Sequence, residues 1–514
     1  MRPISSHIKA ISLLGLPIVV GQLGVIVQGM ADTIMVGQYG TPELSASALV
    51  NNIYNFIIFF LLGISYATTP ITGAAFGQGD DESVSRSLKD SLIVNLSFSA
   101  IIVFLLTVLY FNLDILGQPE KLMPLVRPYY LTIMLSLPFL AGFNALKQFV
   151  EAVGETNIPM RVMLVSNAIN IALNAILIYG MMGLPEWGLF GAGLATFIAR
   201  VFLFVTMLVV VFRERRFKVW TGKVKGENGK LKTDSSASHL SNCSTERGAT
   251  RSEATEGVDK FAHHSPLTAH NCLPETGGRA QSAEGVDKFA HPSSLTSHRS
   301  SLSGSFRMAR IGLPIAVQLC LESASFNIAG MFMGWIGAIP LAAHQVICTI
   351  STLVFMIQYG IGAAAAIRVS QFRGRGEWTE VRHATYSAWG LSATFSLLMV
   401  GCICLFREPI TSIFTSDLRV QTLCYSLLPA FVLYQFGDCT QIIFSNSLRA
   451  LEAVGRMLLY AIIAYLLVSI PMSYLLGIHL GFGAEGVWYG IPFGLTTAGL
   501  LFIYEFRRKT KHLT

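Results

Sequence analysis

The sequence has few charged residues. Asp, Glu, Lys and Arg make up only 13% of its 514 residues, whereas 52% are hydrophobic and the mean hydropathy is +0.54. Soluble domains carry about 25% charged residues, so this deficit excludes an ordinary soluble protein. The apolar runs also lack the alternation, about ten residues long, that is typical of outer-membrane barrel strands. The sequence therefore predicts an all-α integral membrane protein.

The sequence also lacks the spacings that bind metals or support catalysis. Its eight cysteines include no metal-type pair, since Cys402 and Cys404 are separated by one residue only. A protein-bound metal needs several convergent ligands. No zinc His/Glu set and no facing Ser and Lys stand out either. We therefore expect no cofactor, and we expect that the protein is not an enzyme.

Long apolar runs are what the sequence does contain. A membrane-spanning helix needs about 20 mostly apolar residues, and twelve segments qualify. The expected spans are 11–36, 49–73, 91–111, 127–150, 160–180, 189–212, 308–336, 345–369, 384–406, 422–447, 457–479 and 486–505.

Positive charge gathers in alternate connections between these spans. Cytoplasmic loops are enriched in Lys and Arg, so we expect both termini in the cytoplasm and a multi-pass protein of the inner (plasma) membrane. This topology explains the net charge of +7 and gives no reason to expect nucleic acid as a partner; the expected surroundings are lipid, and we expect a monomer. The residues concerned are Arg2, Lys9, Arg86, Lys89, Lys147, Arg161, Arg213, Arg215, Arg216, Lys218, Arg373, Arg375, Arg382, Arg449, Arg456, Arg507, Arg508 and Lys509.

The chain repeats itself at an offset of 297 residues. "GLPIVV" at 15–20 returns as "GLPIAV" at 312–317. Further along, "EAVG" at 151–154 returns at 452–455, outside this offset. Six helices used twice give two parallel lobes, 1–218 and 307–514, whose pseudo-twofold axis runs along the membrane normal. Such lobes are typical of transporters, with Pro17 and Pro314 as matched kink points. Glycines match without a gap at 37 and 334, 40 and 337, 63 and 360, 77 and 374, and 79 and 376.

Residues 219–306 differ from both lobes. They are rich in Ser, Thr, Gly and His, and "EGVDKFAHHSPLTAH" at 256–270 returns with a 28-residue shift as "EGVDKFAHPSSLTSH" at 284–298. Their histidines leave a metal-binding or regulatory loop open. We favour a disordered cytoplasmic insertion made by a tandem duplication, because this composition cannot bury a core.

One acid lies inside the first expected span. Inserting a carboxylate there costs about 2.5–3.5 kcal/mol, so Asp32 is a candidate for binding a proton or a small cation. Its counterpart at the repeat offset is Ala329. In the fifth span, an amide stripe could complete a cation site or simply join helices. It consists of Asn167, Asn170 and Asn174. Thr196 in span six would add an oxygen, and Gln28 lies one turn before Asp32.

The second half has acids of its own. Glu322 lies in span seven, two turns before Ala329. Asp438 lies in span ten, where Tyr434 and Gln441 share its helix face. Two neighbouring buried carboxylates cannot both be charged without a cation or proton between them. The sequence thus predicts ion binding in the second lobe as well.

The chain resembles the multidrug and toxic compound extrusion (MATE) family, of the NorM-like branch, outside 219–306. The likeness rests on "MADTIMVGQYG" at 30–40, "AAHQ" at 342–345, "IRVSQ" at 367–371, "YQFGD" at 434–438 and "SLRA" at 447–450. It implies that Na⁺ binds Glu322, Tyr434 and Asp438, or that Na⁺ or H⁺ binds a first-lobe site. The first-lobe residues implied are Asp32, Asn170, Asn174 and Thr196.

The resemblance implies a secondary antiporter that exports small organic molecules, mainly cationic drugs, in exchange for Na⁺ or H⁺. Gln28, Asn167 and Gln441 are candidates for lining the cavity. The alternative of similar shape is a flippase for lipid-linked oligosaccharides. It would need basic interior residues for a pyrophosphate, whereas the acids noted above lead us to expect an acidic interior. A channel is a further alternative, although a twofold repeat with buried acids suits alternating access better.

Overall fold

The computed structural model describes residues 3–113, 122–221 and 301–511, and these ranges contain helices and no strands. Within these ranges, twelve helical segments are long and apolar enough to cross a membrane, which confirms the all-α membrane fold. The first half contains α1 (Ile4–Tyr39), α2 (Thr41–Ser65), α3 (Thr68–Gln78), α4 (Asp81–Phe111), α5 (Met123–Ala152), α6 (Asn157–Tyr179), α7 (Gly188–Arg213) and the short α8 (Lys218–Thr221).

The second half repeats this order. It contains α10 (Ser301–Ile336), α11 (Ala338–Arg375), α12 (Trp378–Leu405), the short α13 (Arg407–Phe414), α14 (Leu418–Ala450), α15 (Val454–Ala461), α16 (Ile470–Tyr474) and α17 (Gly483–Lys511). In the eleventh span, a π-helical segment at Ile462–Ser469 joins α15 to α16, and a second one at Leu475–His479 follows α16. The predicted insertion and its tandem repeat lie almost entirely outside the described residues.

The second span differs between the halves. In the first half, α2 and α3 together make the second span, whereas its counterpart α11 is continuous. Pro70 lies at the third residue of α3, and its ring has no N–H to donate to the carbonyl of Tyr66, four residues earlier. The helix is interrupted at Tyr66 and Ala67. Ile367 occupies the matched position in α11 and lets that helix continue.

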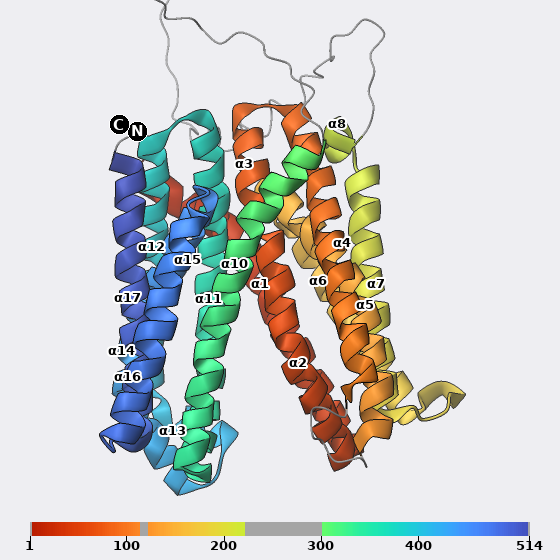
Figure 1. Ribbon diagram of the computed structural model, residues 1–514, viewed down its shortest axis with the longest axis vertical. Helices are drawn as coiled ribbons and strands as arrows, with labels where there is room; N and C mark the ends of the chain where they lie inside the picture. Colours follow the sequence, from red (N-terminus) through yellow and green to blue (C-terminus); the bar gives the residue numbers. More distant parts are fainter. Residues whose placement is uncertain (1–2, 114–121, 222–300, 512–514) are drawn as a thin grey trace, which may run out of the picture. The chain divides into compact units, whose positions relative to one another are not determined.

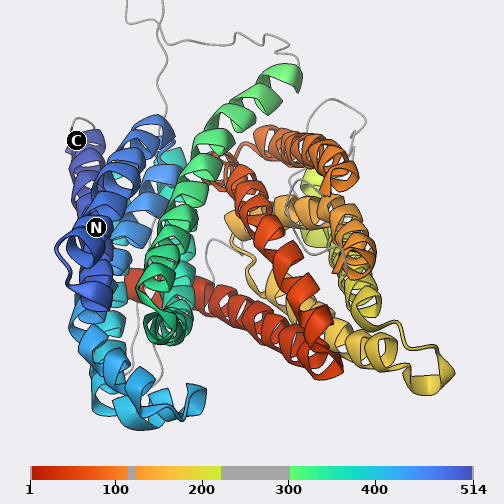
Figure 2. The same ribbon diagram turned by 60° about the horizontal axis from the view of Figure 1, so that its bottom comes forward.

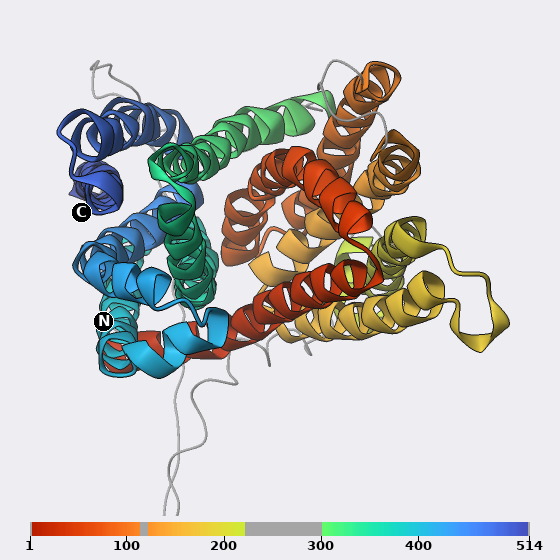
Figure 3. The ribbon, with the colours of Figure 1, turned by 90° about the horizontal axis from the view of Figure 1, so that it is seen from below.

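The two halves pack against each other by a reciprocal exchange of contacts. α1 of the first half packs on α11 of the second, and α10 of the second half packs on α2 of the first. Figure 1 shows α10 in green beside α2 in red, and Figure 2 shows the same pair from another side. In Figure 3, α1 runs from α12 of the second half toward α6 of the first, both of which it contacts.

The repeated glycines lie where these helices cross. A Cβ on Gly15 would approach the carbonyl oxygen of Gly360 to 3.2 Å, and a Cβ on Gly312 would approach that of Ile64 to 2.9 Å. Both separations are at or below close van der Waals contact. The repeated "GLP" motif therefore permits one helix of each half to lie against the backbone of the other half.

A second pair of matched glycines closes the end of the bundle nearer the termini. A Cβ on Gly77 in α3 would overlap the backbone oxygen of Gln371, and a Cβ on Gly374 in α11 would overlap that of Ala74. Two residues later, Gly79 and Gly376 end these helices with φ of 73° and 75°, a left-handed conformation that favours glycine.

The "EAVG" repeat does not mark equivalent positions. α5 ends at Ala152 and α14 at Ala450, an offset of 298 residues. Gly154 and Glu452 are the left-handed residues that follow, with φ of 96° and 55°. Glu151 is therefore equivalent to Arg449 rather than to Glu452, so the halves carry opposite charges at this position.

Candidate functional site

The first-half polar residues come together on facing sides of α1, α6 and α7. Asn174 donates a hydrogen bond to Asp32 Oδ1 at 2.5 Å, and it also contacts Asn170 Oδ1 at 3.3 Å. Asn170 Nδ2 lies 3.5 Å from the hydroxyl of Thr196. Asn170 and Asn174 are fully buried. The structure thus places all four residues of the expected first-lobe site in one chain of contacts.

Two further candidates take different places around this cluster. Gln28 lines the same cavity as Asp32 and hydrogen-bonds to its carboxylate. Asn167, one turn before Asn170, lies instead against Gly24 of α1, and its side-chain nitrogen has no hydrogen-bond partner. Of the amide stripe, Asn170 and Asn174 therefore belong to the Asp32 cluster, whereas Asn167 packs against α1.

A cavity of about 360 Å³ opens beside Asp32. Its wall includes Arg200, whose guanidinium donates to Ser136 at 2.7 Å and acts electrostatically on Asp32. Tyr129 and Asn51 also line it and are hydrogen-bonded at 3.2 Å. Sequence reasoning missed these residues. Arg200 within the apolar "FIARVF" was the available signal, since a charge inside a span is a functional candidate.

The second-half acids lie in a separate cluster built from α10 and α14. Gln441 Nε2 donates to Glu322 Oε2 at 3.2 Å, and the Tyr434 hydroxyl donates to Asp438 Oδ2 at 3.3 Å. Asp438 and Tyr434 are almost fully buried, at 1% and 3% exposure. The two carboxylates interact electrostatically. The structure thus brings together all four residues singled out in this lobe.

Three more polar side chains surround the second-half acids. Gln318 Nε2 donates to Glu322 Oε2 at 3.2 Å, and Arg449 donates to Gln318 Oε1 at 2.7 Å. Tyr465 of the eleventh span is 1% exposed, and its hydroxyl has no hydrogen-bond partner. Sequence reasoning placed Arg449 among the loop cations and passed over the other two, although Gln318 stands one helical turn before Glu322.

The expectation of an acidic interior is wrong. Arg200 lies beside the first-half acid, and Arg449, 5% exposed, lies beside the second-half pair. Loop counting misplaced Arg449, because α14 continues to Ala450 and holds the side chain inside the bundle. Among the residues named here, the first cluster has one acid and one arginine, whereas the second has two acids and one arginine.

A smaller cavity of about 90 Å³ lies between the halves. Phe59 of α2 and Phe355 and Tyr359 of α11 line it, and Glu322 reaches it from α10. Gln441 and Arg449 complete part of the same wall. The cavity therefore combines aromatic rings with one carboxylate of the second-half cluster.

Polar contacts join the halves beyond this cavity, toward the termini. The hydroxyls of Tyr66 and Tyr359 are hydrogen-bonded across the interface, and Gln371 Nε2 donates to the carbonyl oxygen of Ala152 at 3.0 Å. Buried Glu151 and Lys147 lie 3.8 Å apart beside them. These contacts close the bundle on the terminal side.

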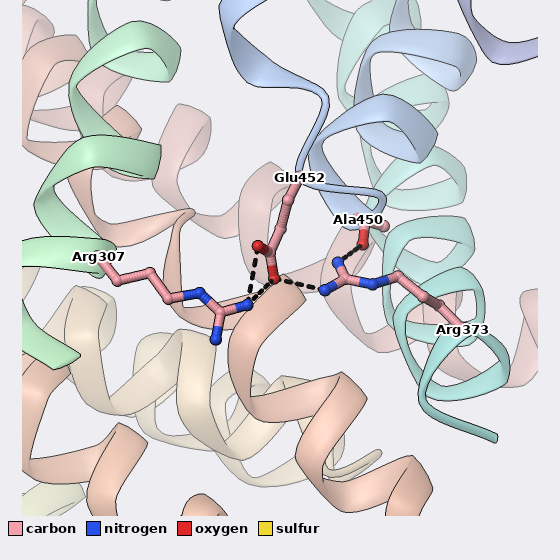
Figure 4. A network of polar contacts seen from close by, with 4 residues as sticks. All are labelled: Arg307, Arg373, Ala450 and Glu452. Atoms are coloured by element: carbon pink, nitrogen blue, oxygen red, sulfur yellow. Dashed lines mark hydrogen bonds and ion pairs between the residues drawn. The ribbon is translucent and has the colours of Figure 1, made fainter. Parts of the chain in front are cut away.

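An ion-pair network ties three helices together on the same side (Figure 4). Glu452 accepts from Arg307 of α10 at 2.9 Å through each carboxylate oxygen, and from Arg373 of α11 at 2.5 Å. Arg373 also donates to the carbonyl oxygen of Ala450 at 2.7 Å. Burial disfavours the charge of Glu452, but the two arginines outweigh it and hold the pKa of this carboxyl below its ordinary value.

Two parallel six-helix lobes, each with a buried acid cluster, define a two-lobed polytopic membrane protein. The MatE family model matches residues 17–176 and 314–475, which is most of both lobes. The chain belongs to this family.

Bacterial relatives match almost the whole chain. The "Probable multidrug resistance protein NorM" of Bradyrhizobium diazoefficiens is 27% identical over 506 residues, covering 97% of this chain and 93% of the relative. The "Multidrug resistance protein MdtK" of Yersinia pseudotuberculosis is 26% identical over 514 residues, covering 98% and 96%.

Solved structures share the fold. The eukaryotic MATE transporter AtDTX14 has a TM-score of 0.76 at 17% identity, covering 100% of this chain and 99% of that one. A multidrug resistance MATE family transporter of the MOP superfamily, solved in its outward-facing conformation, has the same score, identity and coverage. At this identity the likeness establishes the fold alone.

Proposed function

We propose that this protein is a secondary antiporter that exports small organic molecules, cationic ones among them, in exchange for Na⁺ or H⁺. The observation that carries the proposal is the pair of buried acid clusters, one in each lobe, each beside a cavity of its own. The names of its bacterial relatives support multidrug transport rather than catalysis.

The second-half cluster is the stronger candidate for the coupling ion. Its two acids face a single arginine, so one negative charge is left without a compensating base among these groups. A buried charge without compensation is costly, and a bound Na⁺ or proton removes that cost. Na⁺ prefers oxygen ligands as other hard cations do. Glu322, Asp438 and the Tyr434 hydroxyl provide such oxygens.

The first-half cluster offers a second place for the ion. Here Asp32, the side-chain oxygens of Asn170 and Asn174, and the Thr196 hydroxyl would surround a Na⁺, or Asp32 would take up a proton. The positive charge of Arg200 already compensates the negative charge of Asp32, so a bound cation would stabilise this cluster less. We therefore assign the first-half site a role in exchanging a proton, or in sensing cargo in the adjacent cavity.

The side chains that line the cavity between the lobes suit a flat organic cation. The face of an aromatic ring attracts cations by about 0.5–2 kcal/mol, and Phe59, Phe355 and Tyr359 supply such faces. Glu322 adds the charge. Because Glu322 would also hold the ion, cargo and ion compete for one carboxylate, which is the condition for coupling them.

In the proposed cycle, this arrangement is the state that releases cargo outside the cell. The lobes close on the side of the termini, through Tyr66, Tyr359 and Gln371. The positive charge on that side supports our proposal that it faces the cytoplasm and that the protein lies in the inner (plasma) membrane. In the proposed cycle, ion binding in this state displaces the cargo. Release of the ion to the cytoplasm then lets new cargo bind.

The proposal is tested by dye efflux from vesicles under an imposed Na⁺ or pH gradient. We expect the Asp438→Asn variant to lose gradient-driven efflux, because the paired acid no longer needs a cation. We expect Asp32→Asn to reduce it. Gln435→Ala is a matched control, since Gln435 is equally buried in α14 but bonds to Gln358 instead. Full gradient-driven efflux in both acid variants would contradict the coupling proposal.

The flippase alternative requires basic residues in the interior of the protein, and the structure meets this requirement. Arg200 and Arg449, however, line different cavities in different lobes. A pyrophosphate is bound best by arginines that converge on it. The separation therefore favours export of small molecules. Transport of a lipid-linked oligosaccharide in vesicles, without dye efflux, would reverse this choice.

A further inference from the structure

A cluster of metal-ligating side chains lies at the terminal end of the bundle, away from both acid clusters. His7 belongs to the second turn of α1, while Glu380 and His383 lie one turn apart near the start of α12. One ligand atom from each residue lies within 4.8 Å of the other two. We propose that these three residues bind a divalent transition metal ion, with Zn²⁺ as the best match.

The ligand types and spacing suit this ion. Zn²⁺ is bound by imidazole nitrogens and carboxylate oxygens at about 2.0–2.2 Å, so ligand atoms around it lie roughly 3.4 Å apart. The distance from His7 Nε2 to Glu380 Oε2, 3.0 Å, is already in this range. Small side-chain rotations would bring His383 inward. Two histidines and one carboxylate leave the fourth position for water.

An independent observation is that both histidines have buried ring nitrogens without a hydrogen bond. His7 is fully buried, yet neither of its ring nitrogens makes a hydrogen bond of acceptable geometry. His383 Nδ1 is also buried without a hydrogen bond. Buried polar groups are almost always satisfied, and a histidine buried in this way needs a reason. A shared metal ion satisfies both rings at once.

The charges around the cluster limit the affinity. Glu380 attracts a cation, whereas Arg368 acts electrostatically on His7 in the opposite sense. Arg368 lies 4.6 Å above the ring of Phe372, which itself packs edge-on against His7 at 5.9 Å. A positive neighbour weakens a site for a divalent cation, so we expect binding in the micromolar range.

The site would connect the two halves. α1 carries Asp32 in the first half, but its terminal end packs on α11 and α12 of the second half. A metal held by His7, Glu380 and His383 fixes that end of α1 to α12. If the protein alternates between two states, as proposed above, the metal would slow the exchange and act as an inhibitor from the terminal side.

Metal binding is tested on the purified full-length chain by titration with Co²⁺, followed through its visible d–d absorption, with Zn²⁺ as competitor. All samples carry serine at the six histidines of residues 239–298, which would otherwise add background sites. We expect one Co²⁺ per chain, displaced by Zn²⁺. Affinity should fall at least about tenfold in His7→Ala and in His383→Ala.

His344→Ala is the matched control, because His344 is also buried but lies beside Cys348 in α11. It should bind Co²⁺ like the parent. If His7→Ala fails to fold, His383→Ala and Glu380→Gln carry the test. Equal affinity in all variants, or no binding at micromolar Co²⁺, would overturn the site. This binding assay needs no transport, so it is independent of the proposed function.

Inhibition is tested separately by adding Zn²⁺ on the terminal side during dye efflux. We expect slower efflux in the parent and no effect in His383→Ala. Efflux that is unaffected in a parent shown to bind Zn²⁺ would overturn the link between α1 and α12, though not the metal site.

Discussion

The matched glycines Gly77 and Gly374 allow a quantitative test of the closed terminal side. Each lies against backbone of the opposite half, Gly77 on Gln371 and Gly374 on Ala74. A methyl group at either position cannot be accommodated by turning a side chain, because the atom it meets is a carbonyl oxygen. The helices α3 and α11 must move apart instead.

The cost follows from this overlap. Forcing an extra carbon into a close-packed contact destabilises it by about 1–3 kcal/mol. Since about 1.4 kcal/mol changes an equilibrium tenfold, Gly77→Ala and Gly374→Ala should each raise the population open at the terminal side by roughly 5- to 150-fold. The gain in helix propensity on replacing glycine works in the opposite direction, by up to about 1 kcal/mol, but it does not depend on which state is populated.

Opening can be measured by thiol labelling. Ser370→Cys, in a chain whose native cysteines are replaced, puts a fully buried thiol beside Gly73 in the closed interface. Its labelling rate by a membrane-impermeant reagent reports the open population. We expect the rate to rise by the stated factor in both glycine variants. In Gly390→Ala it should stay unchanged, since nothing lies within 4 Å of that Cβ. Equal rates in all three would refute the reasoning.

Three further predictions concern Glu452 and the insertion. Glu452→Gln should lower the stability to thermal unfolding by roughly 1–2 kcal/mol at neutral pH, because it removes charged hydrogen bonds to Arg307 and Arg373. The pKa of Glu452 is lowered in the folded protein, so this difference should be present above the ordinary glutamate pKa and vanish as the pH falls through the folded value; a gap that persists in acid would contradict the ion-pair explanation. Glu452→Gly should unfold at a higher temperature than Glu452→Gln, since it relieves a left-handed backbone by roughly 1–2 kcal/mol. Deleting 223–298 should leave dye efflux intact in normally inserted protein, and loss of efflux would show that the insertion has a role.

Much of the fold could be predicted because membrane helices and their repeat leave local signals. Long apolar runs located all twelve spans, and glycine matches at one offset identified the two halves. The function of those glycines was not predictable, because a close crossing involves residues hundreds of positions apart, such as Gly15 and Gly360. The equivalence of Glu151 and Arg449 could not be predicted either. The repeated "EAVG" aligns Glu151 with Glu452, three residues beyond Arg449.

The acid clusters were partly predictable for a similar reason. A carboxylate or an amide in an apolar run is visible in the sequence, and helical spacing groups residues such as Tyr434 and Asp438 on one face. Spacing does not tell which neighbouring helix completes the cluster. Spacing alone therefore does not place Gln318 and Tyr465 in the cluster, whereas Arg200, a charge inside a span, is visible in the sequence as a candidate.

The two halves have the same scaffold but different charges, and this difference bears on how an exchanger could work. If each lobe carried one acid compensated by one arginine, neither lobe would require a bound cation. A Na⁺ or H⁺ gradient would then have little effect on either lobe. The Glu322 and Asp438 cluster of the second lobe instead has two acids for one arginine, while at the matched helix end Glu151 of the first lobe pairs with Lys147. Asymmetry of this kind gives one lobe a need for a cation that the other lacks. A coupling ion would then bias the lobes unequally, which a shift between two states requires.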